Sequence, residues 1–158
     1  MKNQRITEAM LQFIEESPTA FHAAANVEAL LFFFFFFYLV NLAEGARVPG
    51  GSYYTMQNGS AVLAVKIPEN PAKGFRIAAS HSDSPCFKIK EVPEMKVENT
   101  YVKLNVEKYG GMILSPWLDR PLSVAGRVFV AGKDGKPEAK LVNLKKDLLI
   151  IPNVAIHF

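Results

Sequence analysis

The chain has 158 residues, of which 49% are hydrophobic and 21% charged. This balance is ordinary for one globular domain with a sizeable core. The net charge of +3 is small, and the lysines are scattered from Lys66 to Lys146 without a stripe or interleaved aromatic residues. Nucleic acid is therefore not expected as a partner.

Neither an internal disulfide nor a secretory leader is expected. Cys86 is the single cysteine, which fits a reducing compartment. Glu8, Glu15 and Glu16 stand where a leader would need its apolar region. We therefore expect a cytoplasmic protein.

Apolar residues at helical spacing predict two helices in the first part of the chain. The first helix runs to Pro18 with Thr7 as a possible cap, and Thr19 could cap the second. His22 lies inside the second helix, and no other histidine stands three or four positions away. We therefore assign His22 a packing or capping role rather than a metal-binding one.

Six consecutive phenylalanines, Phe32 to Phe37, lie in an apolar run of about a dozen residues, too short to span a bilayer. An unbroken aromatic run has neither helical nor strand periodicity. It could be a buried junction, a contact with a membrane surface or a partner, or a local anomaly without function. We favour the anomaly and expect no membrane association.

From Val48 onward the pattern changes to strands joined by tight turns, with Asn58-Gly59 a strong hairpin signal. Trp117 lies in a constrained loop between two prolines, where an ion pair of Asp119 with Arg120 is expected to brace the chain. The expected strands are 52–57, 60–67, 74–80, 86–92, 100–108, 123–131 and 139–143.

The most informative stretch is 77–85, an apolar run that ends in His81, Asp83 and Pro85. In an extended chain residues i and i+2 point to the same side, so His81 and Asp83 should be neighbours while Ser82 faces away. A carboxylate beside an imidazole can fix its tautomer, as it does for many metal-binding histidines. A hydrogen-bonded histidine at the end of a strand is the alternative, and from the residues alone both stay open. A hydrolase triad with Ser80 is a poor interpretation, because sequence neighbours on alternating faces cannot form the relay.

A set of motifs resembles the N-terminal part of the M18 metallo-aminopeptidases, the aspartyl aminopeptidase family. The resemblance covers nearly the whole chain in the right order, although the phenylalanine tract replaces a mixed amphipathic helix end. The motifs are Ser17-Pro18-Thr19-Ala20-Phe21-His22-Ala23, Asn58-Gly59-Ser60, Ala79-Ser80-His81-Ser82-Asp83-Ser84-Pro85-Cys86, Tyr109-Gly110-Gly111, Trp117-Leu118-Asp119-Arg120-Pro121-Leu122-Ser123-Val124-Ala125-Gly126-Arg127 and Ile151-Pro152-Asn153-Val154-Ala155-Ile156-His157.

The resemblance implies roles for three residues. His81 matches a ligand of a two-zinc centre, Asp83 matches the aspartate that supports this ligand, and His157 matches a histidine that helps to complete the active site of a neighbouring subunit. The family's general base and remaining ligands lie later in the polypeptide, and Glu15-Glu16 cannot stand in for them because it precedes His81. The chain also stops on an apolar run, so we expect it to be cut inside a longer protein.

The sequence thus predicts an α/β protein with a zinc-exopeptidase-like sheet and flanking helices. Residues 1–90 are expected to belong to the catalytic domain, and residues 91–158 to begin an inserted β-rich dimerisation domain. The expected function is zinc-dependent removal of N-terminal residues, perhaps acidic ones, from peptides, by a homo-oligomer when full length. The alternative is a truncated, non-catalytic remnant or subunit-interaction fragment, and we expect this chain alone to be inactive.

Overall fold

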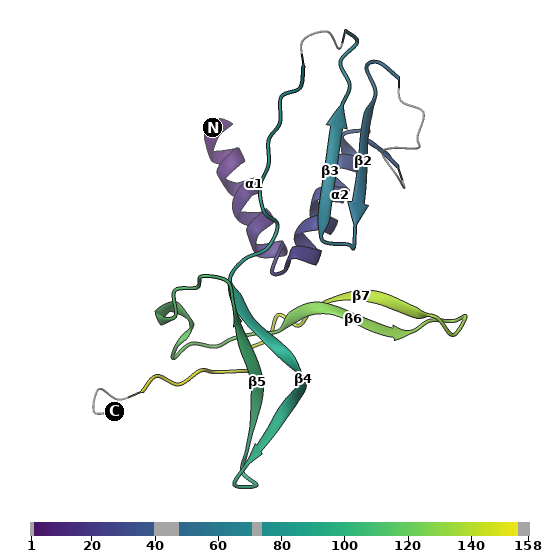
Figure 1. Ribbon diagram of the computed structural model, residues 1–158. Coiled ribbons are helices and arrows are strands. Elements are labelled where there is room, and N and C mark those ends of the chain that lie inside the picture. The colour runs from purple at the N-terminus through teal and green to yellow at the C-terminus, as the bar shows by residue number, and fades with distance from the viewer. Residues whose placement is uncertain (1, 40–47, 71–73, 155–158) are drawn as a thin grey trace. The chain divides into compact units, whose positions relative to one another are not determined.

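The computed structural model describes residues 2–39, 48–70 and 74–154. They form a mixed α/β arrangement whose elements follow one another as Figure 1 labels them. The chain divides into two compact units, one made of the residues up to 83 with 124–145, the other of 84–123 with the residues from 146 on. Each unit is described by itself.

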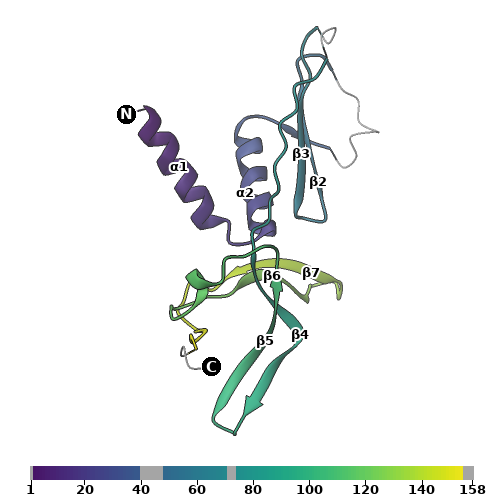
Figure 2. The same cartoon turned by 60° about the vertical axis from the view of Figure 1, so that its left-hand side comes forward.

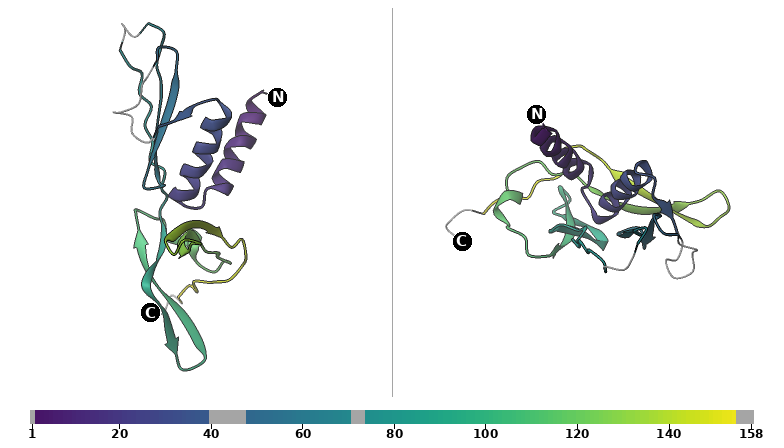
Figure 3. Two further views of the ribbon diagram at one scale, coloured as in Figure 1. Left: turned by 90° about the vertical axis from the view of Figure 1, so that its right-hand side faces the viewer. Right: turned by 90° about the horizontal axis from the view of Figure 1, so that it is seen from above.

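The first unit begins with two helices, α1 (Lys2–Glu16) and α2 (Ala20–Phe33), which lie side by side (Figure 3). Thr19 caps α2 as predicted, since its backbone is extended and its hydroxyl oxygen accepts a hydrogen bond from the His22 amide at 3.4 Å. The cap expected at Thr7 is wrong, because α1 already begins at Lys2. Asn26 joins the helices by donating to the Glu16 carbonyl at 3.0 Å, one of the carbonyls that a helix end leaves without a partner.

Strands β2 (Ser52–Gln57) and β3 (Ala61–Lys66) form the predicted antiparallel hairpin. Three residues, 58–60, lie between the paired ends Gln57 and Ala61. Asn58 and Gly59 have φ of 54° and 69°, the left-handed conformation that Asn-Gly adopts in hairpin turns. Strand β1 (Phe37–Tyr38) adds to β2 in parallel. Strands β6 (Ala125–Ala131) and β7 (Pro137–Asn143) form a separate antiparallel pair.

The core of this unit is small and lies between α2 and the β2–β3 hairpin. Tyr54 is buried and donates its hydroxyl to Glu28 of α2 at 3.2 Å. Burial raises the pKa of Tyr54, and the Glu28 carboxylate adds to this, so the phenol stays protonated as the hydrogen bond requires. The buried residues in the described ranges are Ala23, Ala24, Tyr53, Tyr54 and Thr55.

The second unit is dominated by β4 (Cys86–Val97) and β5 (Tyr101–Tyr109), an antiparallel ribbon seen clearly in Figure 2. Its register shifts between Ile89 and Glu94, as at a β-bulge. A short 3₁₀ turn, η1 (Ser115–Trp117), brings the indole of Trp117 edge-on to Phe87, with ring centroids 5.4 Å apart.

The ion pair expected between Asp119 and Arg120 is wrong. The Asp119 carboxylate accepts a hydrogen bond from the Asn153 amide at 2.8 Å, and Arg120 donates to the Pro116 carbonyl at 3.3 Å. Both side chains therefore bind backbone groups that a loop leaves without partners. Arg120 still braces the loop that carries Trp117, but through a carbonyl.

The strand expected at 74–80 is absent, and this part of the chain has no regular structure. Phe75 and Ile77 are exposed, the latter at 89%. An apolar strand of this kind is stable when neighbouring strands pair with it and both its faces are covered, and in the described ranges no strand pairs with it. A run of apolar residues is therefore not enough to form a strand when no neighbouring strand pairs with it.

The interpretation of the phenylalanine tract as a buried junction is also wrong. Helix α2 ends within it at Phe33, and the chain then turns through Phe35, which has φ of 60°. The side chains of Phe32 and Phe35 are 76% and 85% exposed. No helix in the described part of the chain is long and apolar enough to cross a membrane.

Candidate metal-ligand site

His81 is held by Asp83 in the irregular segment that leads into the second unit. The imidazole Nδ1 lies 2.8 Å from the backbone oxygen of Asp83 and 3.1 Å from its carboxylate Oδ1. Both oxygens can only accept a hydrogen bond, so Nδ1 carries the proton. The unprotonated nitrogen of the neutral ring is then Nε2, and the side chain is 81% exposed.

The residue between them faces another partner, as the alternation predicted. Ser82 donates its hydroxyl to the Ser60 carbonyl at 2.8 Å, in the β2–β3 turn. The contact of His81 with Asp83 is therefore confirmed, and Ser82 binds a different partner, although the segment is not a strand. The roles of His81 as a metal ligand and of Asp83 as its support stay predictions.

This geometry fits one zinc ligand. A histidine that binds zinc through one nitrogen usually donates the other N–H to a carboxylate or a carbonyl, and His81 does both. A catalytic zinc takes three protein ligands and an open position. Among the residues that the structure describes, no group of three His, Cys, Asp or Glu side chains could hold a metal ion.

His22 does not add to this site. The Nδ1 of His22 lies 2.8 Å from the Thr19 hydroxyl. Burial lowers the pKa of the His22 imidazole. This agrees with the capping role predicted for it. His157 lies outside the described residues.

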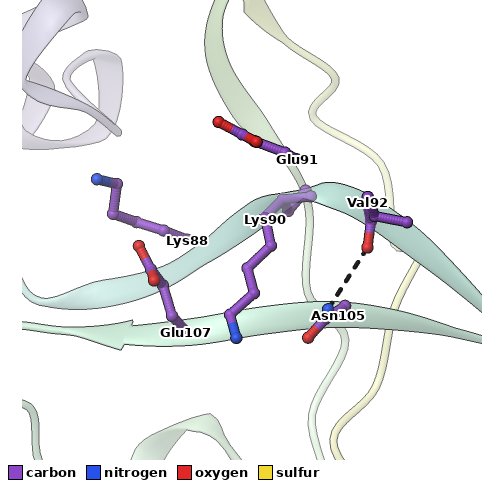
Figure 4. Close-up of a pocket in the computed structure, with 7 residues that line it drawn as sticks. Lys88, Lys90, Glu91, Val92, Asn105 and Glu107 are labelled. Atoms are coloured by element: carbon purple, nitrogen blue, oxygen red, sulfur yellow. Dashed lines mark hydrogen bonds between the residues drawn. The ribbon is translucent and has the colours of Figure 1, made fainter.

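A hollow of about 480 Å³ lies on the β4–β5 ribbon beside the register shift (Figure 4). Its rim carries Lys88, Lys90, Glu91 and Glu107, and Asn105 donates to the backbone at 3.5 Å. Lys88 and Glu107 face each other across the strands, so their charges offset one another. Five of the lining residues are polar or charged and two, Ile89 and Val92, are apolar, so the hollow lacks the mainly apolar lining of a ligand site.

Comparisons with known proteins agree with the resemblance in the sequence. The sequence profile described as "Aminopeptidase I zinc metalloprotease (M18)" matches residues 13–158. The chain therefore belongs to the M18 aminopeptidase family, whose members are zinc metalloproteases. A relative described as "Probable M18 family aminopeptidase 2", from Clostridium acetobutylicum, is 44% identical over 99% of this chain.

Solved structures extend this agreement to the fold. The mApe1 structure from Chaetomium thermophilum superposes with a TM-score of 0.88 and 32% identity over 97% of this chain and 36% of its own. The mApe1 dodecamer of S. cerevisiae gives a TM-score of 0.87 at 28% identity, over 99% of this chain and 37% of its own. The chain likewise spans 37% of the length of the Clostridium relative.

Proposed function

We propose that this chain supplies one zinc ligand, His81, to a metallo-aminopeptidase that removes N-terminal residues from peptides. The observation that carries the proposal is the contact of His81 Nδ1 with both oxygens of Asp83 in a chain of the M18 family. It leaves Nε2 free to bind metal and fixes the direction of the ring.

Zinc, when bound, lowers the pKa of a water molecule and polarises the scissile carbonyl. The role of this chain's residues is to hold the His81 side chain, the proposed zinc ligand, in place. The Asp83 carbonyl and carboxylate keep the proton on Nδ1 and fix the direction of the ring. Since the described residues offer no three-ligand group, the further ligands of a two-zinc site would come from outside the described ranges.

The finer features of the proposal follow the family. His157 would help to complete the site of a neighbouring subunit in a homo-oligomer, and the S. cerevisiae relative is described as a dodecamer. Residues 1–90 would belong to the catalytic domain, with a zinc-exopeptidase-like sheet, and residues 91–158 to the start of a β-rich dimerisation domain. The substrates would be peptides, those with an acidic first residue among them, in the cytoplasm.

A second candidate function is a non-catalytic remnant or a subunit-interaction fragment. Two observations favour it: the absence of a three-ligand group from the described ranges, and the exposure of large apolar side chains such as Phe75 and Ile77. In that case the contact of His81 with Asp83 would be retained from an ancestral enzyme, although His81 would bind no metal.

A chimera separates the two candidates. This chain would replace the matching part of the Clostridium acetobutylicum relative, and zinc content and hydrolysis of an aspartyl or glutamyl chromogenic amide would be measured. The aminopeptidase proposal expects no turnover by the chain alone, and bound zinc with turnover in the chimera.

His81→Ala in the chimera should remove turnover and lower the zinc content, whereas Ser80→Ala, a change of the neighbouring residue, should leave both unchanged. A folded chimera with neither zinc nor turnover would favour the remnant.

A further inference from the structure

Residues 75–82, which carry His81, form no regular element, and within the described ranges no backbone hydrogen bond joins them to another segment. The bond from the Ser82 hydroxyl to the Ser60 carbonyl, at 2.8 Å, does reach another element. Because Ser82 lies between His81 and Asp83, a restraint on Ser82 acts on the residues on both of its sides.

The anchor for this bond is the turn of the β2–β3 hairpin. The Ser60 amide donates to the Gln57 carbonyl at 3.1 Å, which closes the turn. The carbonyl of Ser60 is then left for Ser82, and that of Asn58 accepts from Arg127 of β6 at 2.7 Å. The turn is thus bound from two sides, by the segment of His81 and by β6.

Arg127 is itself held by aromatic rings. Its guanidinium carbon lies 4.0 Å from the ring centroid of Phe21 on α2 and 5.3 Å from that of Phe129. A flat guanidinium can stack on a ring and still donate within its own plane, which a lysine ammonium cannot do in the same way. Arg127 therefore connects α2 and β6 to the turn.

We propose that Ser82 and Arg127 are positioning residues for His81. Ser82 ties the segment of His81 to the β2–β3 turn, and Arg127 holds that turn against α2 and β6. The value of this arrangement for zinc binding rests on the function proposed above. The positioning itself is a property of the chain without metal and can be measured there.

The test uses the 158-residue chain labelled with ¹⁵N. Backbone order parameters are measured at His81 and Asp83 in the parent chain and in Ser82→Ala, Ser82→Thr and Ser80→Ala. The proposal expects backbone order parameters of about 0.85 in the parent and below about 0.6 in Ser82→Ala. Ser82→Thr keeps a hydroxyl and should restore order. Ser80→Ala removes a neighbouring hydroxyl and should change nothing.

Arg127 is tested in the same way. Arg127→Gln should loosen His81, and Arg127→Lys should restore order only in part, because it keeps the charge but not the planar donor. Lys140→Gln removes a positive charge from the paired strand β7 and is the matched control. Circular dichroism confirms that each variant is folded.

Zinc gives the second measurement, and it uses the chimera because the described residues offer no three-ligand group. The metal-free chimera is titrated with Zn²⁺, and Ser82→Ala should weaken the apparent affinity by about threefold, the loss of one exposed hydrogen bond. If the folded chimera binds no zinc, the proposed zinc role fails while the order parameters still decide the positioning. Equal order in the parent and Ser82→Ala, or an equal loss in Ser80→Ala, would overturn the role of Ser82. Unchanged order in Arg127→Gln would overturn that of Arg127.

Discussion

The tautomer of His81 is the feature of the site that a single substitution tests most directly. Asp83 offers two acceptors to Nδ1, the carbonyl at 2.8 Å and the carboxylate at 3.1 Å. Asp83→Ala removes the carboxylate and leaves the carbonyl, so the preference for the proton on Nδ1 should fall without disappearing. At an exposed site the lost hydrogen bond contributes about 0.7 kcal/mol, which is about a threefold change in the ratio of the two neutral tautomers.

The ratio is measured from the ring ¹⁵N and ¹³C chemical shifts of the labelled chain at about pH 8, on the neutral ring. Asp83→Asn keeps an oxygen acceptor without the charge and should give an intermediate ratio. Asp134→Ala removes an exposed aspartate from a turn far along the sequence and should leave the ratio of His81 unchanged. A parent chain with the proton mainly on Nε2, or an unchanged ratio in Asp83→Ala, would refute the geometry on which the zinc proposal depends.

Three further predictions concern the stability of the chain and use urea unfolding. Because burial lowers the pKa of His22 below its ordinary 6.5, the unfolded chain takes up the proton first. The stability should therefore be full above that pH and fall as the pH drops below it, and His22→Gln should flatten this dependence. Tyr54→Phe removes the hydrogen bond to Glu28 and should cost about 1 kcal/mol; a change near zero would show that the bond contributes nothing. Gly59→Ala places a side chain at φ of 69° and should cost about 1 kcal/mol, whereas Gly111→Ala, where an added Cβ meets nothing within 4 Å, should be nearly neutral.

Most structural features that depend only on residues close together in the sequence were predicted correctly. Thr19 caps α2 because its hydroxyl reaches an amide three residues away, and Asn58 with Gly59 forms the hairpin turn because both adopt positive φ. These contacts need nothing from distant parts of the chain. The two helices and the strands β6 and β7 were predicted for the same reason.

Strand β4 is longer than predicted. The alternation of apolar and charged residues predicted a strand over 86–92, and the next residue, Pro93, has no N–H to donate to a neighbouring strand. The strand continues to Val97. The register shift between Ile89 and Glu94 leaves this stretch out of the pairing, so no partner strand needs the missing N–H of Pro93.

The site was predicted in part. The spacing of two residues identified the contact of His81 with Asp83, because it needs only an extended backbone. The bond from Arg127 to the turn spans 69 positions in sequence, and no local pattern in the chain indicates it. In the sequence, Arg127 is only the last residue of a motif shared with the family, and no role was predicted for it.

The carbonyl of Asp83 changes what the motif itself means. Side-chain reasoning assigned the support of His81 to a carboxylate, yet the shorter of the two contacts is with the backbone oxygen. A backbone acceptor persists after any substitution at position 83 that keeps the local conformation. The identity of residue 83 therefore adjusts the strength of the support, while Ser82, in the positioning role proposed above, helps to keep the backbone oxygen within reach of the ring.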